Sequence, residues 1–310
     1  APGTGKTVFA EAFAHELDIP FMEVMNTFNQ FVGVSEQNMQ NLLDVAWAQR
    51  PVVLFFDEIE QLLLPRGSVY HGDSGVFARS SRMLMQFFSD PKIHGQVLIF
   101  AATNRPDLLD VAMKRAGRFG AKIPFLIPTK AERPSIWKAL LRKEVIRLGL
   151  MRNSLDISRV INDEKLIEEL SGMVDFWEKD GGLIYGPPDP NKFSGEVISL
   201  TGAEMEDIIG LAFQPFLEDL DISTFNQLSK KERCELLSEK YHLGQEFVLT
   251  GDMLKEAIKN YLPREDVRTY NAMNDMALLS VNDLRFIPPA YRDRARKLRT
   301  KQRPPETFLP

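Results

Sequence analysis

The sequence predicts an α/β fold in which a parallel β-sheet flanked by helices is followed by a smaller, helical domain. Three observations lead to this prediction. A glycine-rich segment at the start of the chain precedes a helical pattern. Two short apolar runs, 52–56 and 97–102, each end in polar residues, as buried strands of a parallel sheet do. After residue 128 the apolar residues recur at helical spacing instead.

Composition narrows the class of protein. A length of 310 residues is enough for two compact units, each with its own core. The net charge of -5 argues against a protein that binds nucleic acid over most of its surface. Cys234 is the one cysteine, which leaves no internal disulfide and favours the cytoplasm or another reducing compartment, such as an organelle stroma. The apolar runs are too short to span a bilayer, so we expect no membrane segment.

The first residues match the end of the phosphate-binding loop pattern G-x-x-x-x-G-K-[ST]. Its first glycine would precede Ala1, so we expect the α/β part to be truncated at its N-terminus, with a strand upstream. In this pattern, glycines let backbone N–H groups approach phosphate oxygens, and the following helix directs its positive end at them. We therefore expect the Lys6 side chain to reach the β- and γ-phosphates and the Thr7 hydroxyl to bind Mg²⁺. The candidate nucleotide-binding residues of the loop are Pro2, Gly3, Thr4, Gly5, Lys6 and Thr7. The alternative is that these residues form a turn before a helix and match the pattern by chance. The motifs described next favour the phosphate loop over this alternative.

Polar residues follow both apolar runs. Asp57 and Glu58 come directly after the first run, and Asn104 follows the second. Ligands of open α/β sheets bind at the carboxyl ends of the strands. We therefore expect Asp57 to hold Mg²⁺ through its waters and Glu58 to orient and deprotonate an attacking water. Asn104 would lie beside the γ-phosphate and help to place that water. The alternative is that these are solvated residues at strand ends.

Together with FFDEIE at 55–60, ATNRPDLLD at 102–110 and KRAGRF at 114–119, the phosphate loop resembles the AAA subfamily of AAA+ ATPases, which includes cell-division-control/valosin-like and FtsH-like modules. The resemblance covers roughly residues 1–263. It implies a P-loop NTPase sheet followed by a small α-helical lid, with ATP and Mg²⁺ as cofactors. It also implies ATP hydrolysis in a homo- or hetero-oligomeric ring, expected to be a hexamer.

By the same resemblance, Arg115 and Arg118 correspond to arginine fingers, which reach the γ-phosphate bound by a neighbouring subunit. A guanidinium there stabilises the charge of the phosphoryl-transfer transition state. The alternative is that Arg115 caps carbonyls at a helix C-terminus. Gly120 stands where the family usually has aspartate.

Phe31, Val32 and Gly33 resemble the aromatic-hydrophobic-glycine loop with which family members line a central channel. An aromatic side chain on a loop can grip an extended polypeptide through apolar contact, so this motif implies a protein substrate. The alternative is that Phe31 packs into the core.

The pattern divides the chain into three parts. The large α/β subdomain occupies 1–128, a helical lid subdomain with an insertion occupies 129–263, and a basic tail occupies 264–310. Residues 179–191 are rich in Gly, Pro and Asp and predict an insertion loop. Within the lid, Gly202 and Ala203 resemble the family's helix start that approaches the nucleotide closely. The basic run of the tail favours docking or partial disorder over binding to nucleic acid.

The leading functional hypothesis is an ATP-driven ring machine that remodels, unfolds or threads a protein through a central pore. One alternative is a structural or assembly subunit with the ATPase fold but little turnover, although the intact motifs argue against it. Others are the ATPase component of a separate protease or of a nucleic-acid complex. His15-Glu16 lacks the second histidine of an H-E-x-x-H zinc motif, so a peptidase would have to be a separate chain.

Overall fold

The computed structural model describes residues 1–24, 34–62, 76–109, 119–148, 157–179, 182–189, 196–217 and 249–301. The chain divides into two compact units. The first unit comprises 1–125 and 273–310, and the second comprises 126–272. Each unit is described by itself below.

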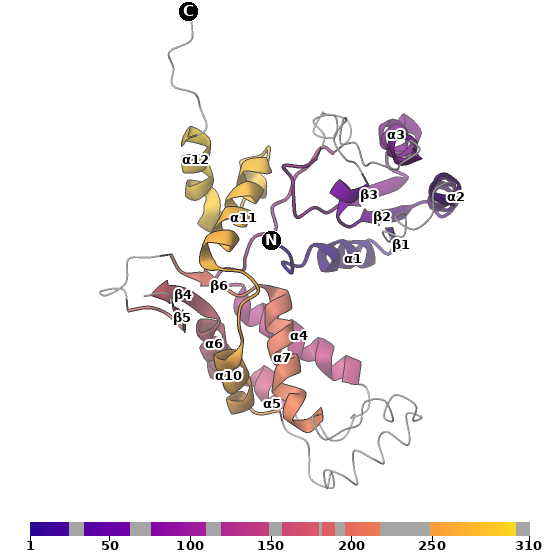
Figure 1. Ribbon diagram of the computed structural model, residues 1–310. Coiled ribbons are helices and arrows are strands. Elements are labelled where there is room, and N and C mark those ends of the chain that lie inside the picture. Colours follow the sequence, from indigo (N-terminus) through magenta and orange to yellow (C-terminus); the bar gives the residue numbers. More distant parts are fainter. Residues whose placement is uncertain are drawn as a thin grey trace, which may run out of the picture. The chain divides into compact units, whose positions relative to one another are not determined.

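The first unit is built on a parallel three-stranded sheet with the order β1-β2-β3 (Figure 1). Its strands are β1 (Phe21–Val24), β2 (Val52–Phe56) and β3 (Val97–Ala101). All five residues of the central strand β2 are buried, as expected for a strand covered on both faces. Because the strands are parallel and in register, their carboxyl ends lie at one edge of the sheet.

Helices cover both faces of this sheet. On one face, α2 (Val34–Ala48) and α3 (Val76–Ser89) pack against alternate residues of β2. On the other face, Ala10 of α1 (Lys6–Glu16) packs with Phe55 and Ala102. The alternation follows from the two-residue repeat of a strand, which sends Leu54 and Phe55 to opposite faces. The predicted α/β fold class is therefore confirmed.

Short 3₁₀ turns follow two of these elements. The turn η2 (Ile59–Gln61) comes directly after β2, and η3 (Pro91–Ile93) follows α3. The Asp90 side chain caps η3 by accepting a hydrogen bond from the backbone N–H of Lys92, at 2.9 Å. Of the two turns, η2 lies at the carboxyl edge of the sheet.

The second unit is mostly helical. Its described helices are α4 (Arg133–Leu148), α5 (Ile157–Asn162), α6 (Glu164–Met173), α7 (Gly202–Leu217) and α10 (Gly251–Asn260). Helix α7 packs against both α4 and α10, and α10 also packs against α6. A Cβ added at Gly251 would come within 2.6 Å of Leu166 Cδ1. A side chain at this position would displace Leu166, so glycine lets α10 begin close to α6 without such a shift.

The second unit also holds a small antiparallel sheet that the sequence analysis did not predict (Figure 1). Its order is β5-β4-β6, with β4 (Asp175–Lys179), β5 (Gly182–Tyr185) and β6 (Ile198–Ser199). The expected loop over 179–191 thus contains a strand. Phe176 and Ile198 pair across β4 and β6 and are both buried, so tertiary packing stabilises strands that are too short to show a clear alternation in the sequence.

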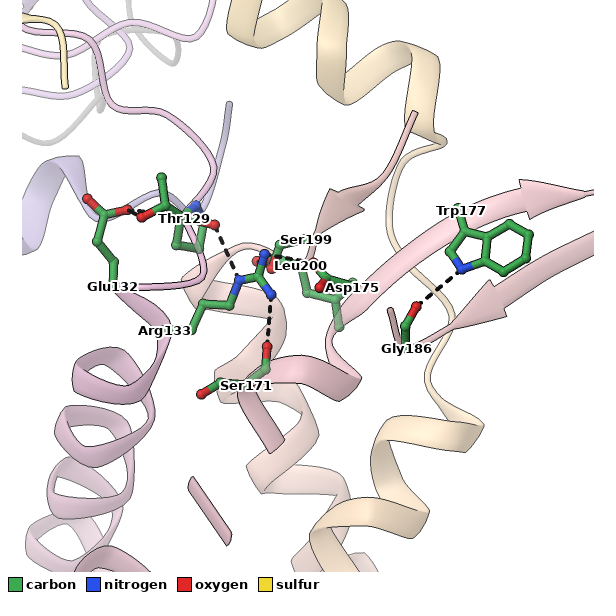
Figure 2. A network of polar contacts seen from close by, with 10 residues as sticks. Thr129, Glu132, Arg133, Ser171, Asp175, Trp177, Gly186, Ser199 and Leu200 are labelled. Carbon is green, nitrogen blue, oxygen red and sulfur yellow. Dashed lines mark hydrogen bonds and ion pairs between the residues drawn. The ribbon is translucent and has the colours of Figure 1, made fainter. Parts of the chain in front are cut away.

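A buried arginine joins three elements of this unit (Figure 2). Arg133, 6% exposed, begins α4. Its Nη1 donates to the Ser171 carbonyl at 2.8 Å, and its Nη2 lies 2.7 Å from Asp175 Oδ1. The start of α4, the end of α6 and the start of β4 are therefore tied together. Just upstream, Thr129 donates from N and Oγ1 to Glu132 Oε2, both at 2.7 Å, which caps the start of this helical segment.

The described part of the C-terminal tail is helical. It contains α11 (Val267–Ser280), η4 (Leu284–Phe286), η5 (Pro289–Tyr291) and α12 (Arg292–Lys301). Several arginines of the basic run bond within the tail itself. Arg294 Nε lies 2.5 Å from Asp275 Oδ1, and Arg292 Nε donates to the Ile287 carbonyl at 3.0 Å. The Asn282 amide donates to the Gly120 carbonyl at 3.1 Å, so the tail contacts the earlier part of the first unit. The tail up to residue 301 is thus a folded element, because its arginines have partners within it.

None of the described helices is both long and apolar enough to cross a membrane.

Candidate nucleotide-binding site

The backbone of the first residues is shaped by glycines. Gly3 and Gly5 adopt φ values of 70° and 90°, in the left-handed region that favours glycine. A Cβ at Gly5 would meet no atom within 4 Å, so the backbone conformation, not lack of space, demands glycine there. Gly5 is the N-cap of α1, and no side chain caps this helix end. The first N–H groups of α1 are therefore open to an anion.

Lys6 begins α1 and meets the end of β3. Its Nζ donates to Asn104 Oδ1 at 2.7 Å and to the Ala1 carbonyl at 2.8 Å. The Thr4 hydroxyl donates to the same carbonyl at 2.9 Å, which closes the loop. Two candidate residues 98 positions apart are thus brought into direct contact. Thr7 follows in the first turn of α1.

Carboxylates surround the Lys6 ammonium group. Burial lowers the pKa of Lys6, whereas the charges of Asp57, Glu60 and Glu58 raise it. All three acids lie just beyond β2, in the turn at the carboxyl edge of the sheet. The site therefore pairs one partly desolvated cation with three acids, an arrangement typical of functional sites.

The two predicted acids lie in a tight turn. The Asp57 carboxylate accepts a hydrogen bond from the Glu58 backbone N–H, with 2.9 Å between Oδ1 and N. Glu58 has a φ of 46°, which is uncommon for a residue with a Cβ. The chain then enters η2, where the Gln61 amide donates to the Glu58 carboxylate. Asp57 and Glu58 are both half-buried.

Glu60 is a site residue that the sequence analysis did not single out. It is 8% exposed, and its Oε1 accepts a hydrogen bond from the Asn104 backbone N–H at 3.3 Å. Its Oε2 is buried and has no hydrogen-bond partner within the described ranges. The signal in the sequence was a third acid in the FFDEIE stretch, but spacing alone does not reveal which acid of such a run points inward. Gln61 was missed for the same reason.

Gly202 and Ala203 begin α7 in the second unit. Thr201 donates from N and Oγ1 to Glu204 Oε2, both at 2.8 Å, which forms a capping box around these two residues. Their expected contact with a nucleotide stays a prediction. The candidate residues Phe31, Val32, Gly33, Arg115 and Arg118 lie outside the described residues.

Comparison with protein families gives a match over the first unit. The model of the family "ATPase family associated with various cellular activities (AAA)" matches residues 1–126. This range contains the phosphate loop, the Asp57-Glu58 turn and Asn104.

Curated relatives align over about half of the chain. The chain is 35% identical over 170 residues to the peroxisomal ATPase PEX1 of Saccharomyces cerevisiae, covering 54% of this chain and 16% of the relative. It is 30% identical over 203 residues to the ATP-dependent zinc metalloprotease FtsH of Pseudothermotoga lettingae, covering 60% and 32%. The cell division cycle protein 48 homolog of Archaeoglobus fulgidus is 34% identical over 144 residues, covering 46% and 19%. The chain thus spans less than a third of each of these relatives.

Among solved structures, the AAA domain of FIGL-1, in a complex with ADP, has a similar fold. The TM-score is 0.53 at 20% sequence identity, covering 87% of this chain and 73% of that one. At this identity the likeness concerns the fold alone.

Proposed function

Because the chain belongs, through residues 1–126, to the AAA family of ATPases, we propose that the cluster of Lys6, Asn104, Asp57 and Glu58 is its site of ATP hydrolysis. The observation that carries this proposal is the hydrogen bond from Lys6 Nζ to Asn104 Oδ1. It brings the start of α1 and the end of β3 together beside the acids that follow β2. Phosphate binding and water activation can then occur in one place.

Each residue has a role that its surroundings support. The uncapped N–H groups of α1 and the Lys6 ammonium group bind the phosphates, since both are donors directed at an anion. Glu58 accepts a proton from the attacking water, and Asn104 orients that water through its amide. The Gln61 amide holds the Glu58 carboxylate in place between turnovers.

Thr7 and Asp57 fit a magnesium site. A hydroxyl and a carboxylate are hard oxygen ligands, which Mg²⁺ prefers. The Asp57 carboxylate accepts one hydrogen bond, from the Glu58 N–H, which leaves lone pairs on its oxygens that would bind the ion or its waters. When bound, Mg²⁺ supplies positive charge that neutralises the phosphate oxygens.

A Glu58→Gln variant tests the site. Removing a general base lowers turnover by about 100-fold or more. Nucleotide affinity, measured with a fluorescent ATP analogue, is expected to stay within about threefold, because Gln retains the shape of the side chain. Glu11→Gln is the matched control, since Glu11 is an exposed acid in the middle of α1. Unchanged ATPase activity in Glu58→Gln would show that the site is wrongly assigned.

The finer function we propose is a ring, expected to be a hexamer, that remodels or threads a protein substrate. The support is the order of the motifs: KRAGRF places Arg115 and Arg118 after Asn104, and Phe31-Val32-Gly33 precedes the acids. Arginines that act on a neighbour's phosphates require an oligomer, and a channel-lining aromatic requires a polypeptide to grip.

A mixing experiment tests the ring. An Arg115→Ala/Arg118→Ala variant and a Glu58→Gln variant are each expected to lose at least about 100-fold in turnover. Mixed subunits pair an intact Glu58 with a neighbour's intact arginines, so activity should return in part. If the mixture stays as slow as its components, the arginines act within their own subunit or not at all.

A Phe31→Ala variant tests the threading. The expected result is normal ATPase activity with a loss of unfolding of a tagged protein substrate. Unfolding at the normal rate would contradict the proposed role of the loop.

A further inference from the structure

The side chain of Glu60 is buried in a way that needs an explanation. Taking a carboxylate out of water is unfavourable by several kcal/mol unless hydrogen bonds compensate. Glu60 accepts one hydrogen bond at 3.3 Å, while its Oε2 is buried without a partner in the part of the chain that the structure describes. An apolar side chain of similar size could be buried here without the desolvation penalty of a carboxylate. The charge of Lys6 also attracts this carboxylate, so the position of Glu60 is explained by the site around Lys6 and not by the stability of the fold.

The single hydrogen bond of Glu60 goes to the backbone of Asn104. Asn104 in turn accepts from Lys6 Nζ through its side-chain Oδ1, at 2.7 Å. One chain of contacts thus runs from the Glu60 carboxylate through Asn104 to the Lys6 ammonium group. The Asn104 N–H is the point at which the segment after β3 is attached to the η2 turn.

The turn that carries Glu60 is itself fixed to the sheet. The Ile59 N–H donates to the Ala102 carbonyl at 3.0 Å, and the Ala102 N–H donates to the Phe56 carbonyl at 2.8 Å. The Ile59 side chain is 1% exposed and lies in the core. Because η2 cannot shift without breaking these contacts, Glu60 can act as a fixed support for Asn104.

We propose that Glu60 is a positioning residue for ATP hydrolysis: it holds the Asn104 backbone so that the Asn104 amide faces Lys6 and the reacting phosphate. This inference rests on the proposed role of Asn104. The glutamate does not touch the nucleotide, and its effect on turnover passes through Asn104.

The test is a double-mutant cycle on the full chain with steady-state ATPase kinetics. A misplaced group can slow an enzyme by up to about 100-fold, so Glu60→Leu is expected to lower kcat at least about tenfold with a smaller change in KM. Asn104→Ala is expected to lower kcat by a similar factor. In the double variant, adding Glu60→Leu to Asn104→Ala should lower kcat by less than about twofold. The reason is that the Asn104 amide, which Glu60 positions, is already absent.

The conservative variant Glu60→Gln keeps an oxygen that can accept from the Asn104 N–H. We expect it to retain at least about a third of the wild-type kcat. Thermal unfolding of every variant is followed in parallel, with Glu11→Gln as control. Should Glu60→Leu not fold, Glu60→Met takes its place in the cycle, because Met also lacks the acceptor oxygens and keeps the length of the side chain.

Three results would overturn the inference. The first is a kcat of the double variant that is lowered by the product of the two single-variant factors. The others are an unchanged kcat in Glu60→Leu and a Glu60→Gln variant as slow as Glu60→Leu. If instead Asn104→Ala leaves kcat unchanged, the result contradicts the proposed role of Asn104, on which the inference about Glu60 rests. The two failures are therefore distinguishable.

Discussion

The two units each bury a glutamate, and the two side chains have opposite surroundings. Glu204, in the second unit, is 0% exposed, and both carboxylate oxygens accept hydrogen bonds. Its donors include the N–H and hydroxyl of Thr201, both at 2.8 Å, and the N–H of Arg264 at 2.9 Å. Among the residues that the structure describes, Glu60 of the first unit has one donor, and its second oxygen has no partner.

We interpret this difference as one between an acid that builds the fold and an acid with the positioning role proposed above. A fully satisfied buried carboxylate fixes the elements around it, since each donor would be left unpaired without it. A poorly satisfied one contributes little to stability and has to be explained by what it positions. Glu204 joins the start of α7 to the segment before α11, whereas Glu60 holds a single backbone N–H beside Lys6.

The largest expected effect is that of Glu204→Leu on the stability of the second unit. Each buried donor left unpaired costs about 1–3 kcal/mol, so the free energy of unfolding should fall by about 3 kcal/mol or more. Urea unfolding followed by tryptophan fluorescence measures it. In a Trp47→Phe background the signal comes only from Trp137 and Trp177, which both lie in the second unit. A loss below about 1 kcal/mol would contradict the contrast with Glu60.

Alkaline pH should weaken the same region. Burial and the charge of Glu204 raise the pKa of Tyr185 to about 12, from an ordinary value of 10.0. Burial, followed by the charge of Glu204 and a hydrogen bond to it, raises the pKa of Tyr270 as well. A group whose pKa is raised by folding stabilises the protein fully below its unfolded pKa. Stability should therefore hold up to about pH 10 and decline towards pH 12, as the unfolded chain loses these protons first.

The measurement is urea unfolding of the Trp47→Phe protein at pH 8, 10 and 11.5, with tyrosine ionisation read from absorbance near 295 nm. Tyr185→Phe serves as the control, because it removes one of the two groups and should flatten the decline. A free energy of unfolding that rises above pH 10 would contradict the assigned direction.

The smallest expected effect is that of Glu60→Leu on the stability of the first unit. Loss of one long hydrogen bond is offset by the removal of a poorly compensated buried carboxylate, so the free energy of unfolding should change by less than about 1 kcal/mol. The signal of Trp47, obtained as the difference between proteins with and without it, reports on this unit. A loss as large as that of Glu204→Leu would make Glu60 a structural acid as well.

Much of the first unit could be predicted from the sequence, because its signals are local. Unbroken apolar runs indicate buried parallel strands, and parallel strands bring their carboxyl ends together. That geometry alone predicted that Asn104 would come close to the residues of the phosphate loop. The hydrogen-bond partners of Asp57 and Glu58 depend instead on the left-handed backbone at Glu58. Glutamate has no preference for this conformation, so the sequence could not predict it.

The second unit was harder to predict. The strands β4 and β5 are short, and Phe176 of β4 is buried against Tyr270 of α11, with 6.3 Å between the ring centroids. The helices of the tail were not predicted, because its basic residues favoured docking or partial disorder, whereas Arg294 and Arg292 have partners inside the tail. In both cases long-range packing overrode local composition.

Because of the left-handed backbone at Glu58, the residue that is best for stability at this position differs from the residue that turnover needs. A glycine there would adopt the φ of 46° without strain, and would relieve about 1 kcal/mol relative to a residue with a Cβ. It would also remove the carboxylate that we assign to water activation. Any programme that selects variants for heat resistance alone is therefore expected to favour Gly at position 58, and such a stabilised protein would no longer hydrolyse ATP.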